Sequence, residues 1–292
     1  MGSNDFYSEE QPVHQVMVVG FWMDDHPVMN SEFRQFVKAT GHVTVAERSP
    51  DPRQYPGIDP ALLVPGSLVF QKPSHRVSLR DPRVWWAYVP GACWKYPKGP
   101  GISGSLPDDH PVTHVAYEDA AAYAAWARKS LPTEAEWEFA ARGGLSQAIF
   151  VWGNESAPGG RIMANTWQGE FPWKNLAATG CEGTSPVGSF PPNGYGLHDM
   201  AGNVWEWTTT FFKPQHLPGG VNACCIPPTA SVNSLGREIP RRVVKGGSYL
   251  CSHQYCFRYR PAARQGEAVD TSACHIGFRC IVRSNRKPAG TA

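Results

Sequence analysis

Charged side chains are scarce in this chain of 292 residues, because only 18% of them are Asp, Glu, Lys or Arg. The formal net charge is +2, and the basic residues are spread along the chain without long blocks. Surfaces that bind nucleic acid are usually strongly basic. The charge balance therefore argues against nucleic acid as a partner.

Long hydrophobic runs are also missing, since none approaches the roughly 18 residues that a membrane-spanning helix needs. The residues that follow Met1 lack the basic start and apolar core of a secretion signal. We therefore expect no membrane partner and no cleaved leader.

The eight cysteines are irregularly spaced in a chain much longer than the small secreted proteins that depend on disulfides. This pattern predicts a reducing compartment, the cytoplasm, and mostly free thiols. We expect Cys224, Cys225 and Cys274 to be structural thiols. A closely spaced pair becomes a candidate for metal or redox chemistry.

Glycine, proline and tryptophan are abundant, with 29, 27 and 11 residues. Many turns supported by large aromatic side chains favour a loop-rich α+β fold with little regular secondary structure. Without an evident linker or repeat, we expect a single domain over residues 1–292. A proline-dense excursion at about 48–109 would be held by Trp85, Trp86 and Trp94.

The first elements are expected near the N-terminus. Residues His14–Met23 are rich in β-branched and aromatic side chains and predict a strand. A short helix would begin with Asn30 or Ser31 as its cap and end before Gly41.

Two further helices are expected in the middle of the chain. The alanine-rich Glu118–Lys129 segment predicts a helix with Tyr123 and Trp126 facing the core. Thr133 and Glu136 have the spacing of a capping box and predict the start of the next helix.

Cys251 and Cys256 are the main candidates for chemistry. Thiols five residues apart converge only if the chain turns between them. If they converge, three outcomes compete: two inert buried thiols, a disulfide or redox dithiol, and a soft-metal site. Two thiolates suit Cu(I). Zinc would need four ligands, and His253 is the one obvious local third.

A second candidate is the glycine-containing segment between Asp199 and Glu206. Its carboxylates and backbone carbonyls could bind Ca²⁺. Alternatively, it forms a turn in which Asp199 and Asn203 bond to the backbone while tryptophans fill the core.

The densest basic cluster surrounds the cysteine pair. A solvated face is the default interpretation of such a cluster, and its position also allows a role in guiding a substrate. Its members are Arg241, Arg242, Lys245, Arg258, Arg260 and Arg264.

Several motifs together resemble the formylglycine-generating enzyme (sulfatase-modifying factor) family, in the family's order over most of residues 110–280. The cysteine pair is the most specific part of this resemblance, because the other blocks also occur in the wider superfamily. The motifs are Leu131-Pro-Thr-Glu-Ala-Glu-Trp137, Trp167-Gln-Gly-Glu-Phe-Pro172, Gly202-Asn-Val-Trp-Glu-Trp207, Gly246-Gly-Ser-Tyr-Leu-Cys251, Cys256-Phe-Arg-Tyr-Arg260 and Ile276-Gly-Phe-Arg279.

The resemblance implies a C-type-lectin-like fold and Cu(I) held by Cys251 and Cys256. A substrate cysteine would join the copper as a third ligand. With O₂ and a thiol reductant, that cysteine would become Cα-formylglycine in an unfolded sulfatase segment carrying Cys-x-Pro-x-Arg. We expect a monomer.

The resemblance also assigns residues around this centre. Ser248 matches the family's active-site serine, and Trp205 and Tyr255 match aromatic side chains close to the copper. For calcium, the implied ligands are the side chains of Asp199 and Glu206, the carbonyls of Gly202 and Val204, and, at a weakened second site, Asn165 and Thr166.

This chain departs from the family at several positions. Ala124, Ala141 and Pro261 stand where secreted relatives place cysteines, so Cys280 has no family partner, and we expect a bacterial-type cytoplasmic enzyme.

Three further departures affect the implied binding sites. Ser252 and His275 replace residues common near the substrate, and Thr179 replaces an acid of the second calcium site. Two alternatives therefore stay open: a lectin-like binding module without catalysis, and an oxidase of the same fold that acts on another thiol substrate.

Overall fold

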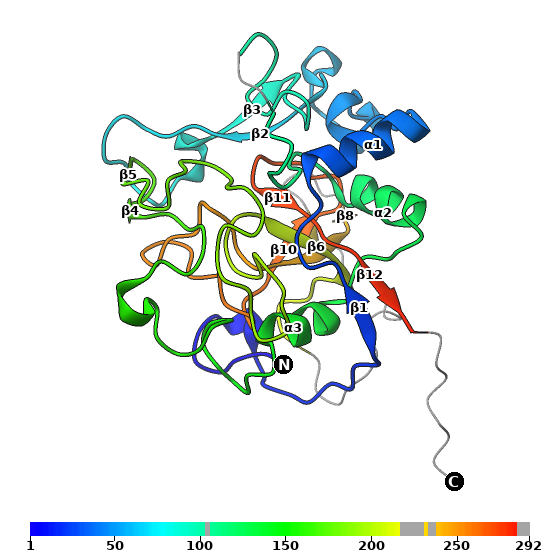
Figure 1. The fold of residues 1–292 in the computed structure, drawn as a ribbon. Coiled ribbons are helices and arrows are strands. Elements are labelled where there is room, and N and C mark those ends of the chain that lie inside the picture. The colour runs from blue at the N-terminus through cyan, green and yellow to red at the C-terminus, as the bar shows by residue number, and fades with distance from the viewer. Residues whose placement is uncertain (103–105, 217–230, 233–237, 285–292) are drawn as a thin grey trace.

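The computed structural model describes residues 1–102, 106–216, 231–232 and 238–284. Short helices and strands are separated by long irregular segments, as Figure 1 shows. The described helices are α1 (Asn30–Thr40), α2 (Tyr117–Trp126) and α3 (Glu134–Arg142). This architecture confirms the predicted α+β, loop-rich fold class.

A four-stranded sheet of order β10-β9-β6-β11 lies at the centre of the molecule. Strand β9 is antiparallel to both β10 and β6, whereas β11 is parallel to β6. The strands are β6 (Trp205–Phe211), β9 (Arg241–Lys245), β10 (Gln265–Ala268) and β11 (Ile276–Gly277). Trp205 pairs with Ile276 at the start of β6, so these two segments of the predicted motifs are neighbours.

The described residues also form four two-stranded sheets. They pair β1 (Phe21–Met23) with β12 (Ile281–Arg283), β2 (Gly66–Phe70) with β3 (Trp86–Pro90), β4 (Gly169–Glu170) with β5 (Lys174–Asn175), and β7 (Ser231–Val232) with β8 (Glu238–Ile239). Single 3₁₀ turns lie at Ser8–Glu10, Val45–Glu47, Pro52–Gln54, Pro60–Leu62, Pro82–Val84 and Pro158–Gly160.

The predicted N-terminal strand is wrong over most of its length. Only Phe21–Met23 forms a strand, paired with β12. Among the described residues, the preceding segment has no partner strand, and Met17 is 93% exposed. β-branched composition alone cannot supply the missing ladder partner.

Helix α1 begins at Asn30, so its N-cap lies before both predicted caps. Met29 is the N-cap, and its backbone N–H donates to the Glu32 carboxylate at 2.8 Å. Asn30 instead donates its side-chain amide to the Pro107 carbonyl. Gly41 ends the helix in the left-handed conformation, as predicted.

The next two helices differ in how well the sequence described them. Helix α2 ends at Trp126, which contacts the buried Phe36 but is still 41% exposed, whereas Tyr123 is buried. The capping box of α3 is confirmed, because the Thr133 hydroxyl accepts from the Glu136 backbone N–H and the Glu136 carboxylate accepts from Thr133.

The basic cluster is largely not a solvated face. Lys245 is fully buried and forms an ion pair with Glu138 at 3.1 Å. Arg264 is 2% exposed and pairs with Glu134 at 2.7 Å. Arg260 is equally buried. These cations are satisfied by acids from distant parts of the chain, which the local sequence could not show.

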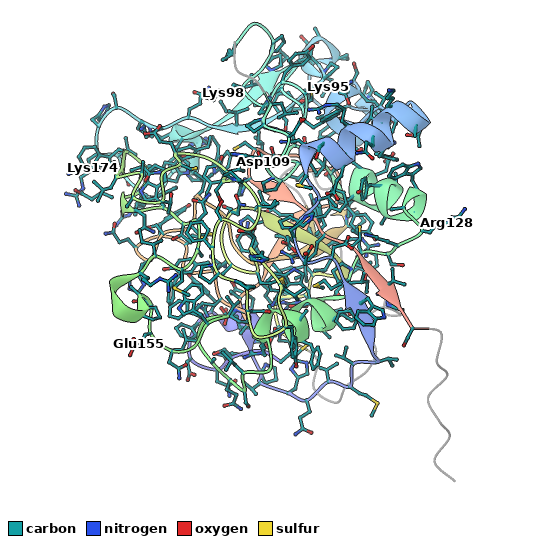
Figure 2. The ribbon with its side chains drawn as sticks, in the orientation of Figure 1. Lys95, Lys98, Asp109, Arg128, Glu155 and Lys174 are labelled. Atoms are coloured by element: carbon teal, nitrogen blue, oxygen red, sulfur yellow. The ribbon has the colours of Figure 1, made fainter. Side chains whose placement is uncertain are left out.

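Exposed charges instead lie around the outline of the molecule, where Figure 2 labels Lys98, Arg128, Glu155 and Lys174. Within the described residues, no helix is long and apolar enough to cross a membrane.

Candidate active site

Two glycines at the end of β9 shape the segment that carries the first thiol. Gly246 and Gly247 have φ values of 91° and 71°. A Cβ on Gly247 would lie 2.9 Å from the backbone nitrogen of Tyr259. Both the positive φ and the close approach require glycine at this position. The turn leads into a buried segment that contains Cys251.

A second turn brings Cys256 back to Cys251. The backbone N–H groups of Tyr255 and Cys256 both donate to the Ser252 carbonyl, at 3.1 and 2.8 Å. The Cys251 and Cys256 sulfurs are consequently 2.9 Å apart. The condition set by the sequence, a turn between the thiols, is met.

The two thiols have different electrostatic environments. Burial raises the pKa of Cys251 well above its usual range, and the neighbouring Cys256 sulfur adds to the shift. The pKa of Cys256 is lowered, first by the hydrogen bond with Cys251 and then by the Arg258 guanidinium, which together outweigh its burial. The pair is therefore suited to holding one thiolate on Cys256 beside a thiol on Cys251.

A cavity of about 540 Å³ opens onto the thiol pair. All five residues predicted for catalysis line it: Trp205, Ser248, Cys251, Tyr255 and Cys256. The Ser248 backbone N–H points at the Cys251 sulfur at 3.4 Å. Segments far apart in sequence thus converge on one site.

Aromatic rings form the walls of this cavity. Tyr255 stacks on Phe171 with centroids 4.7 Å apart and meets Trp85 edge to face. Trp86 covers the ring of His275 at 4.9 Å. Such walls limit the water that reaches the thiols.

His275 is partly buried and interacts with His114, which is fully buried. Burial lowers the pKa of each ring to about 3, so both are neutral near pH 7. Nδ1 of His275 and Nε2 of His114 are buried without a hydrogen-bond partner, although His114 Nδ1 bonds to Ser67 at 2.8 Å.

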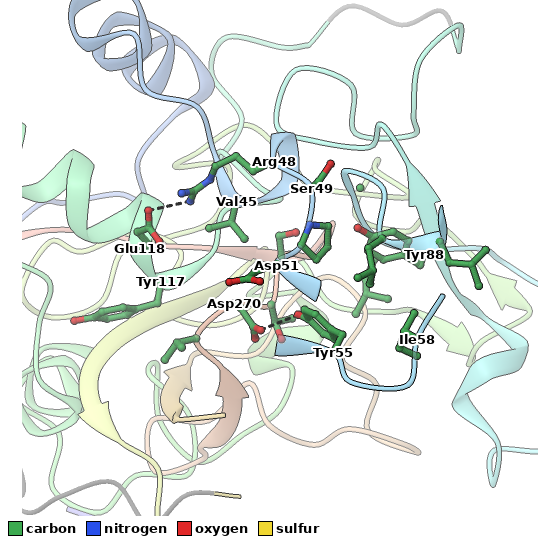
Figure 3. Close-up of a pocket in the computed structure, with 18 residues that line it drawn as sticks. Val45, Arg48, Ser49, Asp51, Tyr55, Ile58, Tyr88, Tyr117, Glu118 and Asp270 are labelled. Carbon is green, nitrogen blue, oxygen red and sulfur yellow. Dashed lines mark hydrogen bonds and ion pairs between the residues drawn. The ribbon is translucent and has the colours of Figure 1, made fainter. Parts of the chain in front are cut away.

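A larger cavity of about 730 Å³ adjoins the first and shares Leu68 and Thr271 with it. Figure 3 shows that much of its lining comes from the proline-dense excursion. Asp270 accepts from the Tyr55 hydroxyl at 2.9 Å, and Arg48 pairs with Glu118 across the rim. The excursion thus builds part of a groove beside the thiols.

The residues predicted as the first calcium site differ in their suitability. One oxygen of Asp199 accepts from the Gly188 N–H at 2.8 Å, while the other is buried without a partner. Burial also raises the pKa of Asp199. An unpaired buried carboxylate oxygen fits a cation.

Glu206, in contrast, has no unpaired carboxylate oxygen. Both of its oxygens accept from Arg279 at 2.8 Å, and one also accepts from the Trp137 indole. Its charge is already neutralised by a buried guanidinium, so this part of the proposed ligand set fits calcium less well. Gly202 and Val204 lie in the intervening buried turn.

The second set of predicted calcium ligands lies beside the first. The Asn165 carbonyl accepts from Asn203 at 2.8 Å, and its side-chain amide donates to Gly183. The Thr166 hydroxyl is already bonded to Gln168. These neutral groups, with Thr179 in the acidic position, make a weak cation site.

The remaining described thiols are free. Cys274 accepts from the Phe70 N–H and the Tyr249 hydroxyl, both at 3.3 Å, which is consistent with a structural role. Cys280 is buried and forms no disulfide. Cys224 and Cys225 lie outside the described residues.

The sequence did not identify the residues that hold the segment after Cys256 in place. Arg258 lines the cavity beside Cys256, and Tyr7, Glu9 and Glu10 contact the segment that follows. The sequence shows the opposite charges of Glu9 and Arg258. It does not show that two residues about 250 positions apart form a pair.

Comparisons with known proteins point to one family. The family model described as "Sulfatase-modifying factor enzyme 1-like domain" matches residues 1–284. The chain is 54% identical to the formylglycine-generating enzyme of Mycobacterium tuberculosis, covering 96% of this chain and 93% of that protein. It is also 35% identical to an "Inactive C-alpha-formylglycine-generating enzyme 2" of Mus musculus, covering 95% and 80%.

Among solved structures, PvdO from Pseudomonas aeruginosa has the same fold, with a TM-score of 0.65 at 22% identity over 97% of this chain and 90% of that one. The fold, the motifs and the nearly full-length matches agree. The chain belongs to the sulfatase-modifying factor family, that of the formylglycine-generating enzymes.

Proposed function

We propose that this protein is a formylglycine-generating enzyme that oxidises a cysteine of a sulfatase polypeptide to Cα-formylglycine. The observation that carries this proposal is the Cys251 and Cys256 thiol pair, 2.9 Å apart at the base of a cavity. The identity to named formylglycine-generating enzymes supports it.

The overall reaction needs both O₂ and a reductant. The substrate –CH₂–SH, O₂ and two external thiols give –CHO, H₂S, a disulfide and water. Conversion of the thiol to the aldehyde removes two electrons, the external thiols supply two more, and O₂ accepts all four. The oxygen of the aldehyde comes from hydrolysis of a thioaldehyde, whose sulfur leaves as H₂S.

The donor set supports Cu(I) as the cofactor. No group of three His, Cys, Asp or Glu side chains suited to a metal occurs within the described part of the chain, so two soft sulfurs stand without a protein third ligand. Cu(I) tolerates such low coordination and prefers sulfur. Bound there, copper would supply the redox chemistry with O₂ and an open position for the substrate thiolate.

The protein's own residues prepare this centre. Arg258 favours the thiolate form of Cys256, and the buried Ser248 N–H holds the Cys251 sulfur in place. The aromatic walls formed by Tyr255 and Trp205 limit water around the substrate thiol.

We further propose that the substrate is an extended segment carrying Cys-x-Pro-x-Arg. The two cavities adjoin at Leu68 and Thr271, and together they offer more room than one side chain needs. Ile58 and Tyr88, together with the acidic Asp270, line the larger of the two cavities. A mixed apolar and acidic surface suits a peptide that contains proline and arginine.

Two supporting proposals concern the environment of the enzyme. The unpaired oxygen of Asp199 supports a bound Ca²⁺, and Asp199→Asn should abolish any rise of the melting temperature with added calcium. Indifference of the wild type to calcium and to a chelator would contradict this proposal. We also propose a monomer in a reducing cytoplasm, consistent with the free thiols of the described residues.

The decisive experiment is mass spectrometry of a Cys-x-Pro-x-Arg peptide incubated with the protein, Cu(I), air and a thiol reductant. We expect an aldehyde product that requires copper and both cysteines. Cys251→Ser, Cys256→Ser and a peptide with serine in place of cysteine serve as controls.

The two alternatives correspond to distinct failures of this experiment. Copper binding without aldehyde would favour an oxidase for another thiol substrate. Absence of both would favour a binding module, as the similarity to a relative named inactive requires us to consider.

A further inference from the structure

Residues 6–10, here called the N-terminal strap, lie against the chain that follows Cys256. Tyr7 accepts a hydrogen bond from the Phe257 backbone N–H at 3.0 Å through its hydroxyl. Glu9 accepts from the Arg258 guanidinium at 2.6 Å. The Tyr7 ring also packs on that guanidinium, 3.8 Å from its centroid. Two consecutive residues after the thiol are therefore held by the strap.

The strap also holds Arg260. Both oxygens of the buried Glu10 accept from the two terminal nitrogens of Arg260. Phe6 covers the same guanidinium at 3.7 Å from its ring centroid. Arg260 in turn donates through Nε to the Phe257 carbonyl at 2.8 Å, which ties this pair back to the loop.

The segment that carries Cys256 has little regular structure of its own. No helix or strand occurs between β9, which ends at Lys245, and β10, which begins at Gln265. Its inner part relies on the Ser252 turn, and Cys256 is followed directly by the residues that contact the strap. The position of the Cys256 sulfur therefore depends on contacts from outside the loop.

Arg258 is the connection between the strap and the reactive pair. It lines the thiol cavity and is held on its other side by Glu9 and Tyr7. Without the Glu9 carboxylate, the guanidinium would lose its charged partner and turn toward solvent or the cavity. Either movement would displace the backbone that positions Cys256.

We propose that Tyr7 and Glu9 are positioning residues that act through Phe257 and Arg258 to keep Cys256 within reach of Cys251. Neither residue lines the thiol cavity. Their contribution is to hold two thiols in the geometry that a single ion can bridge. This inference deepens the proposed function. It rests on that function only for the role of the two thiols in binding a metal ion.

Phenylarsine oxide tests the geometry without any turnover. Its As=O group reacts with two thiols to form two As–S bonds and water, so tight binding requires both sulfurs at once. We expect Glu9→Gln and Tyr7→Phe to weaken binding of this reagent, and of Cu(I), by about tenfold each. Ultraviolet absorbance of the Cu(I)–thiolate complex gives an independent spectroscopic signature.

Two controls separate positioning from loss of the fold. Glu182→Gln makes the same chemical change in a surface ion pair with Lys72 and should leave arsenical binding unchanged. Glu9→Asp keeps the charge and should recover part of the lost affinity. Melting temperatures are compared for all variants, and those within a few degrees of the wild type are used.

A double-mutant cycle tests whether Glu9 acts through Arg258. If it does, the Glu9→Gln/Arg258→Gln double variant binds the arsenical no more weakly than Arg258→Gln alone. Unchanged binding in folded Glu9→Gln and Tyr7→Phe, or fully additive losses in the cycle, would overturn the inference. Because the wild type binds the reagent whether or not it oxidises peptides, this outcome is distinguishable from failure of the proposed reaction.

Discussion

The thiol loop, residues 246–264 between β9 and β10, and the proline-dense excursion are both largely irregular. The ion pairs that stabilise them differ. Around the thiol loop, buried ion pairs join residues about 250 positions apart, as between Arg260 and Glu10. In the excursion, the ion pair of Asp81 and Arg83 joins residues two positions apart and lies at the surface. The buried ion pairs of the first region join distant parts of the chain, whereas this exposed pair of the excursion is local. The excursion is joined to distant residues by other contacts, such as the hydrogen bond of Tyr55 with Asp270.

The excursion repeats one local device. An aspartate precedes a proline at the start of each of three 3₁₀ turns, and its carboxylate accepts from the backbone N–H two residues later. Proline supplies the helical φ, and aspartate satisfies a free donor. The dipeptides are Asp51-Pro52, Asp59-Pro60 and Asp81-Pro82.

The difference corresponds to what each region contributes. Two sulfurs that share an ion must be placed to a fraction of an ångström, which long-range buried contacts can do. A groove for an extended peptide needs shape and charge more than fixed atoms. We therefore expect substitutions at the thiol loop to have large effects and equivalent ones in the excursion to have small effects.

The largest effect is expected at the thiols. Cys256→Ser should lower formylglycine production at least 1000-fold, on the order of the effects seen when an activating group is lost, because one sulfur cannot hold Cu(I). The fold should persist, since the side chain is only slightly smaller. Peptide mass spectrometry and circular dichroism measure the two results. Retained copper-dependent turnover would contradict the proposed role of the pair.

The next effect compares ion pairs directly. Glu10→Gln leaves the Arg260 guanidinium buried and uncompensated, and should lower the free energy of unfolding by about 3–5 kcal/mol. Asp81→Asn alters an exposed pair in the excursion and should cause no resolvable change. Urea unfolding of both variants measures the difference. Equal losses would remove the distinction between the two regions.

Acid should destabilise the protein at two histidines near the thiol cavity. His114 bonds to Ser67 of β2, and His275 lines the thiol cavity, each with a pKa lowered by burial to about 3. The unfolded chain binds these protons below its ordinary pKa of 6.5, whereas the folded chain binds them only near 3. Stability is therefore fully present above pH 6.5 and is lost as the pH falls toward 3.

The expected loss by pH 4 is on the order of 3 kcal/mol for the fully buried His114 and smaller for the partly buried His275. His114→Asn keeps a hydrogen-bonding partner for Ser67 and tolerates the positive φ of this position, 60°, so it should flatten the decline. Denaturant unfolding across this range measures the slope. A slope unchanged by this variant would show that other groups govern acid stability.

Some of this could be predicted from sequence because the signals are local. The cysteine pair, Ser248 and Tyr255 lie within a few residues of one another, so a motif places them together. The capping box of α3 involves Thr133 and Glu136 and needs no distant partner. Trp205 was found through its own motif and proved to line the same cavity.

What failed depends on contacts between distant segments. Arg260 and Lys245 looked like surface cations because their partners, Glu10 and Glu138, are elsewhere in the chain. The strand predicted from His14 has no partner among the described residues over most of its length. Likewise, only the folded chain shows that Trp86 of the excursion covers His275.

The smallest effect is expected at the outer end of the groove. Asp270 lines the larger cavity, and its charge would favour a cationic side chain of the peptide. Asp270→Asn should raise KM for a Cys-x-Pro-x-Arg peptide about threefold to fivefold and leave kcat unchanged, because a partly exposed ion pair contributes little. The hydrogen bond with Tyr55 can survive, since an amide oxygen also accepts.

A peptide with leucine in place of arginine distinguishes charge from shape. It should bind the wild type and Asp270→Asn equally, while Asp108→Asn, a change at a surface pair with Arg34, should leave both peptides unaffected. If the variant weakened both peptides alike, Asp270 would support the groove through Tyr55 and not through its charge. The excursion would then resemble the thiol loop in depending on fixed positions, and the contrast between the two regions would be one of degree.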